Sequence, residues 1–208
     1  LGLANIDVLL GLTPRFTLEH VLSGERELAE VLLHSRDGVR VVPAASGVAR
    51  MAQLDGPQHA SLVRAFSTLP EDFDVMIVDT AAGIGESVCR FSEAAQHVLV
   101  VIRDEPTSLT DAYALIKVLS RDHAVRRFQV LVNMVRDGGS GQLLFRRLQR
   151  VTDRYLDVQL TWAGDIPDDP YVSRAIRAQR ASLEAYPGCR SSRAFVDLAG
   201  QLRRWPRE

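Results

Sequence analysis

Short apolar runs alternate with helical patterns along most of this chain, and that alternation most constrains its fold. The expected strands cover residues 39–43, 73–79, 97–102, 128–133 and 158–166. The expected helices cover residues 58–69, 85–94, 108–119, 142–155, 171–179 and 192–204. Strands this apolar, separated by helices, are typical of parallel sheets that helices cover on both faces. The sequence therefore predicts an α/β fold with a three-layer parallel sheet.

Composition excludes several other classes of protein. A length of 208 residues with 46% hydrophobic and 25% charged residues is typical of one globular domain. The formal net charge of −1 gives the whole chain no general attraction to nucleic acid or anionic lipid. No apolar run is long enough to cross a bilayer. Cys89 and Cys189 lack the spacing of a metal site, and we expect two reduced, buried thiols.

Polar or glycine-containing loops come after four of the expected strands. These loops cover residues 79–83, 103–108, 133–137 and 165–169. Ligands of parallel α/β sheets bind beyond the carboxyl ends of the strands. The loops are therefore the candidate ligand site, although the same residues also occur in ordinary turns.

The strongest single signal is the segment Phe73–Gly83, which reads FDVMIVDTAAG. Its apolar run ends in Asp79, and small residues lead from there to Gly83. One carboxylate beside a phosphate can hold Mg²⁺ with its water shell, and small residues let backbone N–H groups approach a phosphate. The alternative is an aspartate that caps the next turn. We favour the nucleotide interpretation.

Four segments carry a resemblance to a known family. Asp79–Gly85 resembles the Walker B and switch II segment of the deviant-Walker ATPases of the MinD/ParA group, and Leu1–Gly11 is similar to the segment after their switch I aspartate. Glu105–Lys117 and Val132–Val135 resemble the FlhG (FleN) subgroup, which regulates flagellar number and placement. The resemblance implies a P-loop NTPase fold and one MinD-like domain, residues 1–208, without the family's first strand, P-loop and first helix.

The resemblance also implies a role for six residues. Asp79 would hold the water shell of Mg²⁺, and Gly83 would approach the γ-phosphate of ATP. Asn133 would contact adenine, and the stretch Ile166–Asp169, with Pro167 and Asp168 in it, would flank the base from the other side. Asn5 matches a switch I position near the dimer interface. From the residues alone, we favour the simpler interpretation of both: Asn133 as a turn residue at a strand end, and Pro167 as an ordinary loop proline.

The function implied by the resemblance is that of an ATPase that dimerises on ATP and acts through protein partners. The family's partners are the flagellar GTPase FlhF, the flagellar master regulator and switch-complex proteins. The implied location is the cytoplasm, with weak contact to the inner membrane face as one possibility. The C-terminal helix carries Phe195, Leu198 and Leu202 in a stripe that we expect to pack on the sheet instead.

One departure from the family bears directly on activity. The only lysine is Lys117, which has no glycine-rich turn near it, so the 208 residues contain no P-loop. We therefore expect negligible ATP hydrolysis by this polypeptide, because little remains to hold the triphosphate. A non-catalytic module that binds partners through the helix at 108–119 stays open as an alternative.

A partitioning ATPase that binds DNA is a further alternative. Its support is the arginine-lined helix at 142–155, which carries Arg146, Arg147, Arg150 and Arg154. Such runs are usually solvated faces, and we do not expect DNA as a partner.

Overall fold

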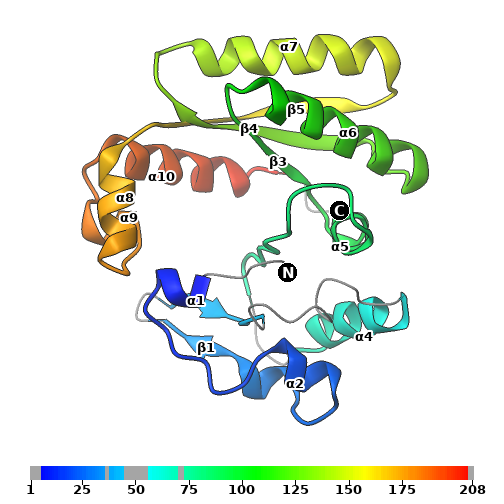
Figure 1. Cartoon of the computed structure of the whole chain (residues 1–208), viewed down its shortest axis with the longest axis vertical. Coiled ribbons are helices and arrows are strands. Elements are labelled where there is room, and N and C mark those ends of the chain that lie inside the picture. Colours follow the sequence, from blue (N-terminus) through cyan, green and yellow to red (C-terminus); the bar gives the residue numbers. More distant parts are fainter. Residues whose placement is uncertain (1–5, 36–37, 45–55, 70–72, 206–208) are drawn as a thin grey trace. The chain divides into compact units, whose positions relative to one another are not determined.

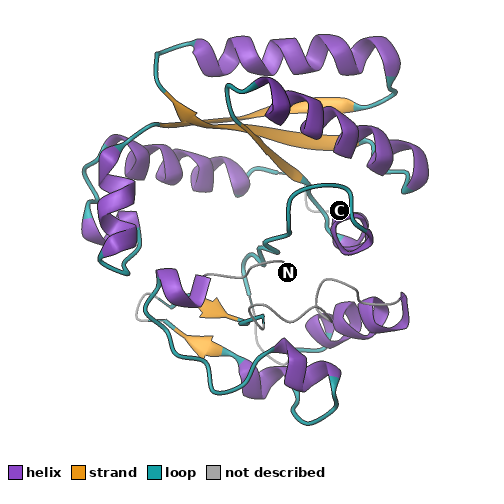
Figure 2. Cartoon of the chain, in the orientation of Figure 1, coloured by secondary structure: helices purple, strands orange, loops and turns teal. Residues whose placement is uncertain are grey.

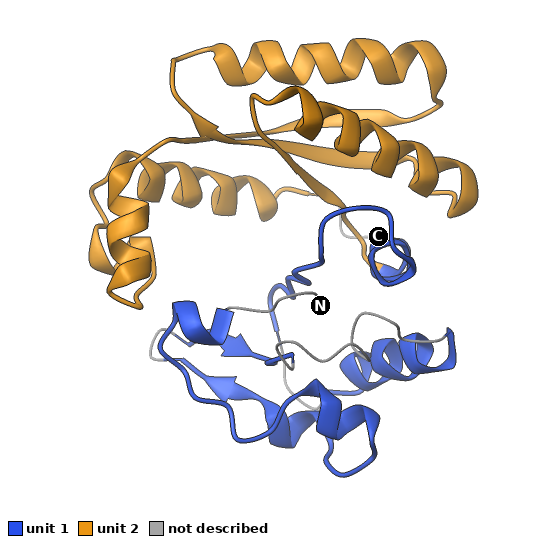
Figure 3. Ribbon diagram, viewed as in Figure 1, with its two compact units in different colours: residues 1–94 blue, residues 95–208 orange. Residues whose placement is uncertain are grey.

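The computed structural model describes residues 6–35, 38–44, 56–69 and 73–205. The chain forms two compact units, residues 1–94 and residues 95–208 (Figure 3). Each unit has a hydrophobic core of its own.

A parallel sheet of three strands organises the C-terminal unit (Figure 1). Its strands are β3 (Leu99–Ile102), β4 (Arg127–Val135) and β5 (Gln159–Pro167), in the spatial order β3-β4-β5. Helix α6 (Pro106–Asp122) connects β3 to β4, and α7 (Ser140–Tyr155) connects β4 to β5. Parallel neighbours require such crossovers because the chain must return to the same end of the sheet.

Helices cover both faces of this sheet. Helices α6 and α7 lie side by side on one face, and α10 (Arg190–Leu202) packs against β5 on the other (Figure 1). Two short helices, α8 (Pro170–Arg177) and α9 (Ser182–Ala185), lead from β5 to α10. The predicted three-layer parallel α/β arrangement is confirmed, as is the packing of the C-terminal helix on the sheet.

The core of this unit lies between the sheet and helices α6 and α7. Its most deeply buried side chains are Ile102, Ile116, Leu119, Phe128, Val130 and Val132. β4 is buried on both faces, whereas β3 alternates: Leu99 and Val101 are exposed, and Val100 and Ile102 are buried. The prediction of a fully buried strand at 97–102 was therefore wrong. In the part of the chain that the structure describes, β3 lies at one edge of the sheet, and α6 covers the face that carries Val100 and Ile102.

The N-terminal unit contains short elements. They are α1 (Ile6–Leu9), α2 (Leu18–Leu22), the 3-10 helix η1 (Leu28–Val31), β1 (Leu33–His34), β2 (Arg40–Val41), α4 (Gly56–Ser67) and α5 (Glu86–Ala94). The predicted strand at 39–43 is present only as Arg40–Val41, and it pairs antiparallel with β1. Gly38, with φ of 75°, precedes β2 and helps the chain to reverse.

Leu18, Leu28, Val31, Ala44, Leu62 and Phe91 form the core cluster of the N-terminal unit. His59 on α4 is buried there, and its Nε2 atom lies 3.0 Å from Ser87 Oγ on α5. The His59 ring also meets the Phe91 ring edge-on, with 5.5 Å between centroids. A polar side chain is tolerated in this core because it has a hydrogen-bond partner.

The segment 73–79 corrects a prediction. It is not a strand: within the described residues it belongs to neither sheet, and Figure 2 draws it as loop. Phe73, Val75, Met76 and Ile77 are exposed, Ile77 to 81%. An apolar sequence forms a strand only where a neighbouring backbone accepts and donates its hydrogen bonds, and the described residues supply no such neighbour here.

The longer helices agree with their predicted positions to within a few residues. The cap of α6 does not: Glu105 occupies the N-cap position, and Pro106 begins the helix, in place of the predicted cap at Thr107 or Ser108. Proline suits this position because its missing N–H group would have no partner inside the helix. Among the described helices, none combines the length and the apolar character needed to span a bilayer.

Candidate functional site

The carboxyl ends of β4 and β5 bring the predicted base-side residues together. Asn133 pairs with Ile166, and Val135 pairs with Pro167, so Met134 bulges out of the register between them. Met134 has a φ of 57°, a left-handed conformation that is rare for residues other than glycine. Asn133 and Pro167 therefore lie at the same edge of the sheet, as the sequence predicted from strand ends alone.

The Asn133 side chain is turned toward its own backbone. Its Oδ1 atom accepts a hydrogen bond of 2.9 Å from the backbone N–H of Met134. The side chain is half-buried, and its amide N–H₂ group points away from that bond with two donors to offer. The ring nitrogens at the edge of adenine accept hydrogen bonds, so the amide donors of Asn133 fit a contact with the base.

Asp168 is held at this edge mainly through its backbone. Its N–H donates to the carbonyl of Val135 at 2.9 Å, and its own carbonyl accepts from Arg190 Nη2 at 3.1 Å. Its carboxylate lies 3.8 Å from Nε of Arg136, whose side chain is almost fully exposed. This exposed contact adds little stability, so the carboxylate remains available to a ligand.

A pocket of about 330 Å³ opens beside Pro167. It lies between the ends of β4 and β5, the loop after β4, and one side of α10. Its lining consists of Val135, Arg136, Asp137, Gly138, Asp165, Pro167, Arg190, Arg193, Ala194 and Asp197. Asn133 is at the same strand end but is not part of this lining. The volume is at the lower end of the range for small-molecule sites.

Asp169 belongs to the loop at 165–169 that the sequence marked, but its role in organising this edge was not predicted. The residue is buried, and its carboxylate accepts hydrogen bonds from the backbone N–H groups of Tyr171 at 3.0 Å and Ser191 at 3.1 Å. The N–H of Ser191, and then that of Tyr171, hold the pKa of Asp169 below its ordinary value, because both bonds favour the charged carboxylate. The signal was available: an aspartate directly before Pro170 marks a helix start.

Cys189 is the N-cap residue of α10, two residues before Ser191. Burial opposes ionisation of the thiol, but hydrogen bonds with the hydroxyl groups of Ser191 and Ser192, and one from the backbone N–H of Ser192, outweigh it and set the pKa of Cys189 below the usual value. The sulfur is half-buried and free of any disulfide. The prediction of a buried thiol holds for Cys89 and only partly for Cys189.

The metal-side residues belong to the N-terminal unit. Asp79 is exposed, and the loop after it turns at Gly83, which has a φ of 97° and open space where a side chain would start. Helix α5 begins at Glu86, three residues on. Asp79 and Gly83 thus lie on one accessible turn, where a phosphate can approach the backbone. Asn5 lies outside the described residues.

A magnesium ion does not need a site in which protein side chains supply all the ligands. Among the residues that the structure describes, no three His, Cys, Asp or Glu side chains gather into a metal site. Mg²⁺ bound with a nucleotide takes most of its ligands from water and phosphate, so a single exposed carboxylate is sufficient. Asp79 fits that requirement.

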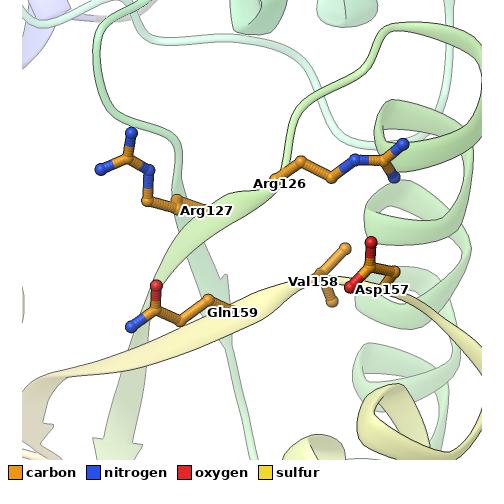
Figure 4. A pocket seen from close by; sticks show the side chains of 5 residues that line it. All are labelled: Arg126, Arg127, Asp157, Val158 and Gln159. Atoms are coloured by element: carbon orange, nitrogen blue, oxygen red, sulfur yellow. The ribbon is translucent and has the colours of Figure 1, made fainter.

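A second pocket lies at the opposite ends of the same strands. It measures about 400 Å³ and is lined by Arg126, Arg127, Asp157, Val158 and Gln159 (Figure 4). Arg126 and Arg127 extend in opposite directions, and Nη1 of Arg126 donates to the carbonyl of Ser120 at 2.8 Å. The two guanidinium groups therefore do not converge on one anion.

The chain is similar to characterised proteins over almost its whole length. It is 54% identical over 206 residues to the antiactivator FleN of Pseudomonas aeruginosa, covering 99% of this chain and 74% of that protein. This chain belongs to the MinD/ParA-type ATPase family, close to FleN. It is also 28% identical to the flagellum site-determining protein YlxH of Helicobacter pylori, over 97% of this chain and 68% of that protein. No family model matches the chain.

Solved structures support the MinD-like P-loop NTPase fold. The cell division ATPase MinD of Pyrococcus furiosus superposes with a TM-score of 0.76 at 23% identity, over 99% of this chain and 83% of that one. MinD of Pyrococcus horikoshii, solved in complex with Mg-ADP, gives a TM-score of 0.74 at 21% identity, over 97% and 79% of the two chains.

Proposed function

We propose that this FleN-like chain is a MinD-like ATPase domain that regulates the number and placement of flagella. The observation that carries the proposal is the 54% identity to an antiactivator over 99% of the chain. A flagellum site-determining protein among the more distant relatives supports the same process. The mechanism would be an ATP-dependent dimer that engages protein partners.

The residues proposed to bind the nucleotide belong to both units of the chain. Asp79 would hold the Mg²⁺ water shell, and the backbone at Gly83 would approach the γ-phosphate. Asn133 would contact adenine, with Pro167 and Asp168 flanking the ring. The bound Mg²⁺ would supply charge stabilisation of the transferred phosphoryl group, while these residues bind and orient the nucleotide. Asn5 would lie near the dimer interface.

The partners are proposed from the relative that the chain resembles and from the family resemblance. An antiactivator acts on an activator, so a flagellar master regulator is the first candidate. The GTPase FlhF and the switch-complex proteins are further candidates from the resemblance. For the 208 residues alone we expect ATP turnover close to background, because Lys117 is the only lysine and lies on α6, away from any glycine-rich turn.

The genetic test replaces Asp79 by Ala in the chromosomal gene and counts flagella per cell by electron microscopy. We expect the variant to resemble the gene deletion, with more flagella or misplaced ones. Asp74→Ala is the matched control, since Asp74 is an exposed aspartate in the same segment. Normal flagella in the Asp79→Ala strain would refute the nucleotide-dependent mechanism, and normal flagella in the deletion strain would refute the flagellar function.

The biochemical test measures nucleotide affinity with a fluorescent ATP analogue and the protein encoded by the native gene. Asn133→Ala is expected to weaken binding about tenfold, as the loss of one or two hydrogen bonds to a base would. Gln149→Ala, on α7, is the control and should bind as the wild type does. Equal affinities for the two variants would remove Asn133 from the base site.

A further inference from the structure

Helix α7 presents two rows of side chains on its exposed face. Arg146, Arg150 and Arg154 form the arginine row, and Leu143, Arg147, Val151 and Tyr155 form the mixed row. Residues four apart on a helix lie one above the other, about 6 Å apart along the axis, so the two rows run side by side. The opposite face, with Leu144, Phe145 and Leu148, is buried against the sheet.

The arginine row is electrostatically unsatisfied. Among the described residues, none forms an ion pair with any of the four arginines of α7, and the guanidinium of Arg154 lies over the Tyr155 ring, 5.3 Å from its centroid. Asp153 is the only acidic residue of the helix. Like charges four residues apart repel each other and weaken a helix. Binding of an acidic ligand would therefore stabilise this surface more than it would stabilise a helix with balanced charges.

The mixed row adds apolar surface beside this charge. Leu143 is 60% exposed, Val151 43% and Tyr155 57%. Single exposed apolar residues are common, but these three lie in one row along the helix, in which Val151 and Tyr155 are neighbours and Arg147 separates them from Leu143. An apolar strip beside a basic row matches a partner helix that carries an apolar stripe flanked by acids.

We propose that this face of α7 docks an acidic amphipathic helix of a protein partner. A second copy of the chain is disfavoured because two arginine rows would repel each other. Duplex DNA would satisfy the arginines but leave the apolar strip against phosphates. A lipid surface is disfavoured because only three apolar side chains could enter it. The proposal deepens the proposed function, since it rests on action through protein partners.

The experiment uses a labelled synthetic helix with glutamate at every fourth position and leucines alongside. Its binding to the protein is measured by fluorescence anisotropy at low and high salt. We expect the double variant Arg150→Glu/Arg154→Glu to lose binding by roughly tenfold or more, and added salt to weaken the wild type. A peptide with lysines in place of the glutamates should bind the double variant better than the wild type.

Arg174→Glu/Arg177→Glu, on α8, makes the same charge change elsewhere in the unit and should leave peptide binding unchanged. Thermal unfolding of both variants checks that they fold. Equal peptide binding by the two double variants, or no binding by the wild type, would overturn the proposal. So would tighter α7-dependent binding to a 20-base-pair duplex or to phosphatidylglycerol vesicles.

Two readouts separate this proposal from the proposed function. Nucleotide affinity of the α7 variant should match that of the wild type, because α7 carries none of the residues proposed to touch ATP. If Asp79→Ala leaves flagella normal while peptide binding depends on α7, the nucleotide mechanism fails and the docking face stands. If Asp79→Ala alters flagella while peptide binding does not depend on α7, the docking proposal fails and the nucleotide mechanism stands.

Discussion

The carboxylate of Asp169 accepts a hydrogen bond from the backbone N–H of Ser191, 22 residues later in the chain, at 3.1 Å. The same carboxylate accepts from Tyr171, in the first turn of α8. One buried side chain thus satisfies donors at the starts of two helices, α8 and α10. Because Pro167 and Asp168 directly precede Asp169, this double cap also holds the edge of the candidate base pocket in place.

Replacing Asp169 by Ala should lower the free energy of unfolding by about 1–3 kcal/mol. The substitution removes a helix cap and leaves a buried N–H group at Ser191 without its acceptor. Urea denaturation at neutral pH measures the change. Asp168→Ala is the control, and it should cost less than about 0.5 kcal/mol because that carboxylate makes only an exposed contact at 3.8 Å. Equal losses in the two variants would contradict the double cap.

The same group predicts a dependence of stability on pH. The pKa of Asp169 is lowered in the folded protein by the N–H groups of Ser191 and Tyr171. The charged form therefore stabilises the fold fully above the ordinary aspartate pKa, near 3.9, and this contribution is lost as pH falls through the lowered folded value. The stability difference between wild type and Asp169→Asn, measured by urea midpoints, should shrink from pH 7 toward pH 3. A constant difference would refute the prediction.

Gly141 and Asp165 make a second close pair, between the first turn of α7 and β5. A Cβ atom built on Gly141 would lie 2.6 Å from Asp165 Oδ2 and 3.1 Å from its Cβ atom. Gly141→Ala should therefore cost about 1–3 kcal/mol through overpacking. Gly200→Ala, inside α10 with open space around it, should instead gain up to about 1 kcal/mol. Thermal unfolding compares the two, and stabilisation by both substitutions would show that Asp165 moves aside.

Met134 gives a prediction that links strain to ligand binding. Its φ of 57° costs an L-residue about 1 kcal/mol, so Met134→Gly should be neutral or stabilising by up to about that amount. It should also weaken nucleotide binding, because a glycine holds the Asn133 amide less firmly. Ala124→Gly, with the same φ of 57° in the loop before β4, should relieve strain without changing affinity. Identical affinities for the two variants would separate Met134 from the site.

The periodicity of apolar residues was sufficient to predict where most helices and strands of the C-terminal unit lie. The helices at α6, α7 and α10 and the strands at β4 and β5 each carry a continuous apolar pattern, and each formed within a few residues of its predicted bounds. The pattern was not sufficient for residues 73–79, which are as apolar as β4 yet form no strand. Periodicity reports what a segment can bury, whereas a strand also requires a neighbour that completes its hydrogen bonds.

Some features of the candidate site could also be predicted from the sequence, and others could not. The positions of Asn133 and Pro167 at one sheet edge could be predicted, because parallel strands end at the same side. The role of Asp169 could not be read in full: its position before Pro170 marks one helix start, but its bond to Ser191 depends on how α10 returns to the sheet.

Local pattern alone thus determined which segments are helical, where β4 and β5 lie, and which polar residues follow them. These properties depend on the spacing of apolar side chains along the chain, and the sequence records that spacing directly. Tertiary structure alone decided which backbone groups find hydrogen-bond partners far away in the chain, as the N–H of Ser191 does. It also decided that Asp165 lies against Gly141, and which face of α7 stays uncovered. Those outcomes depend on how segments distant in the chain pack against one another, which no local window of residues contains.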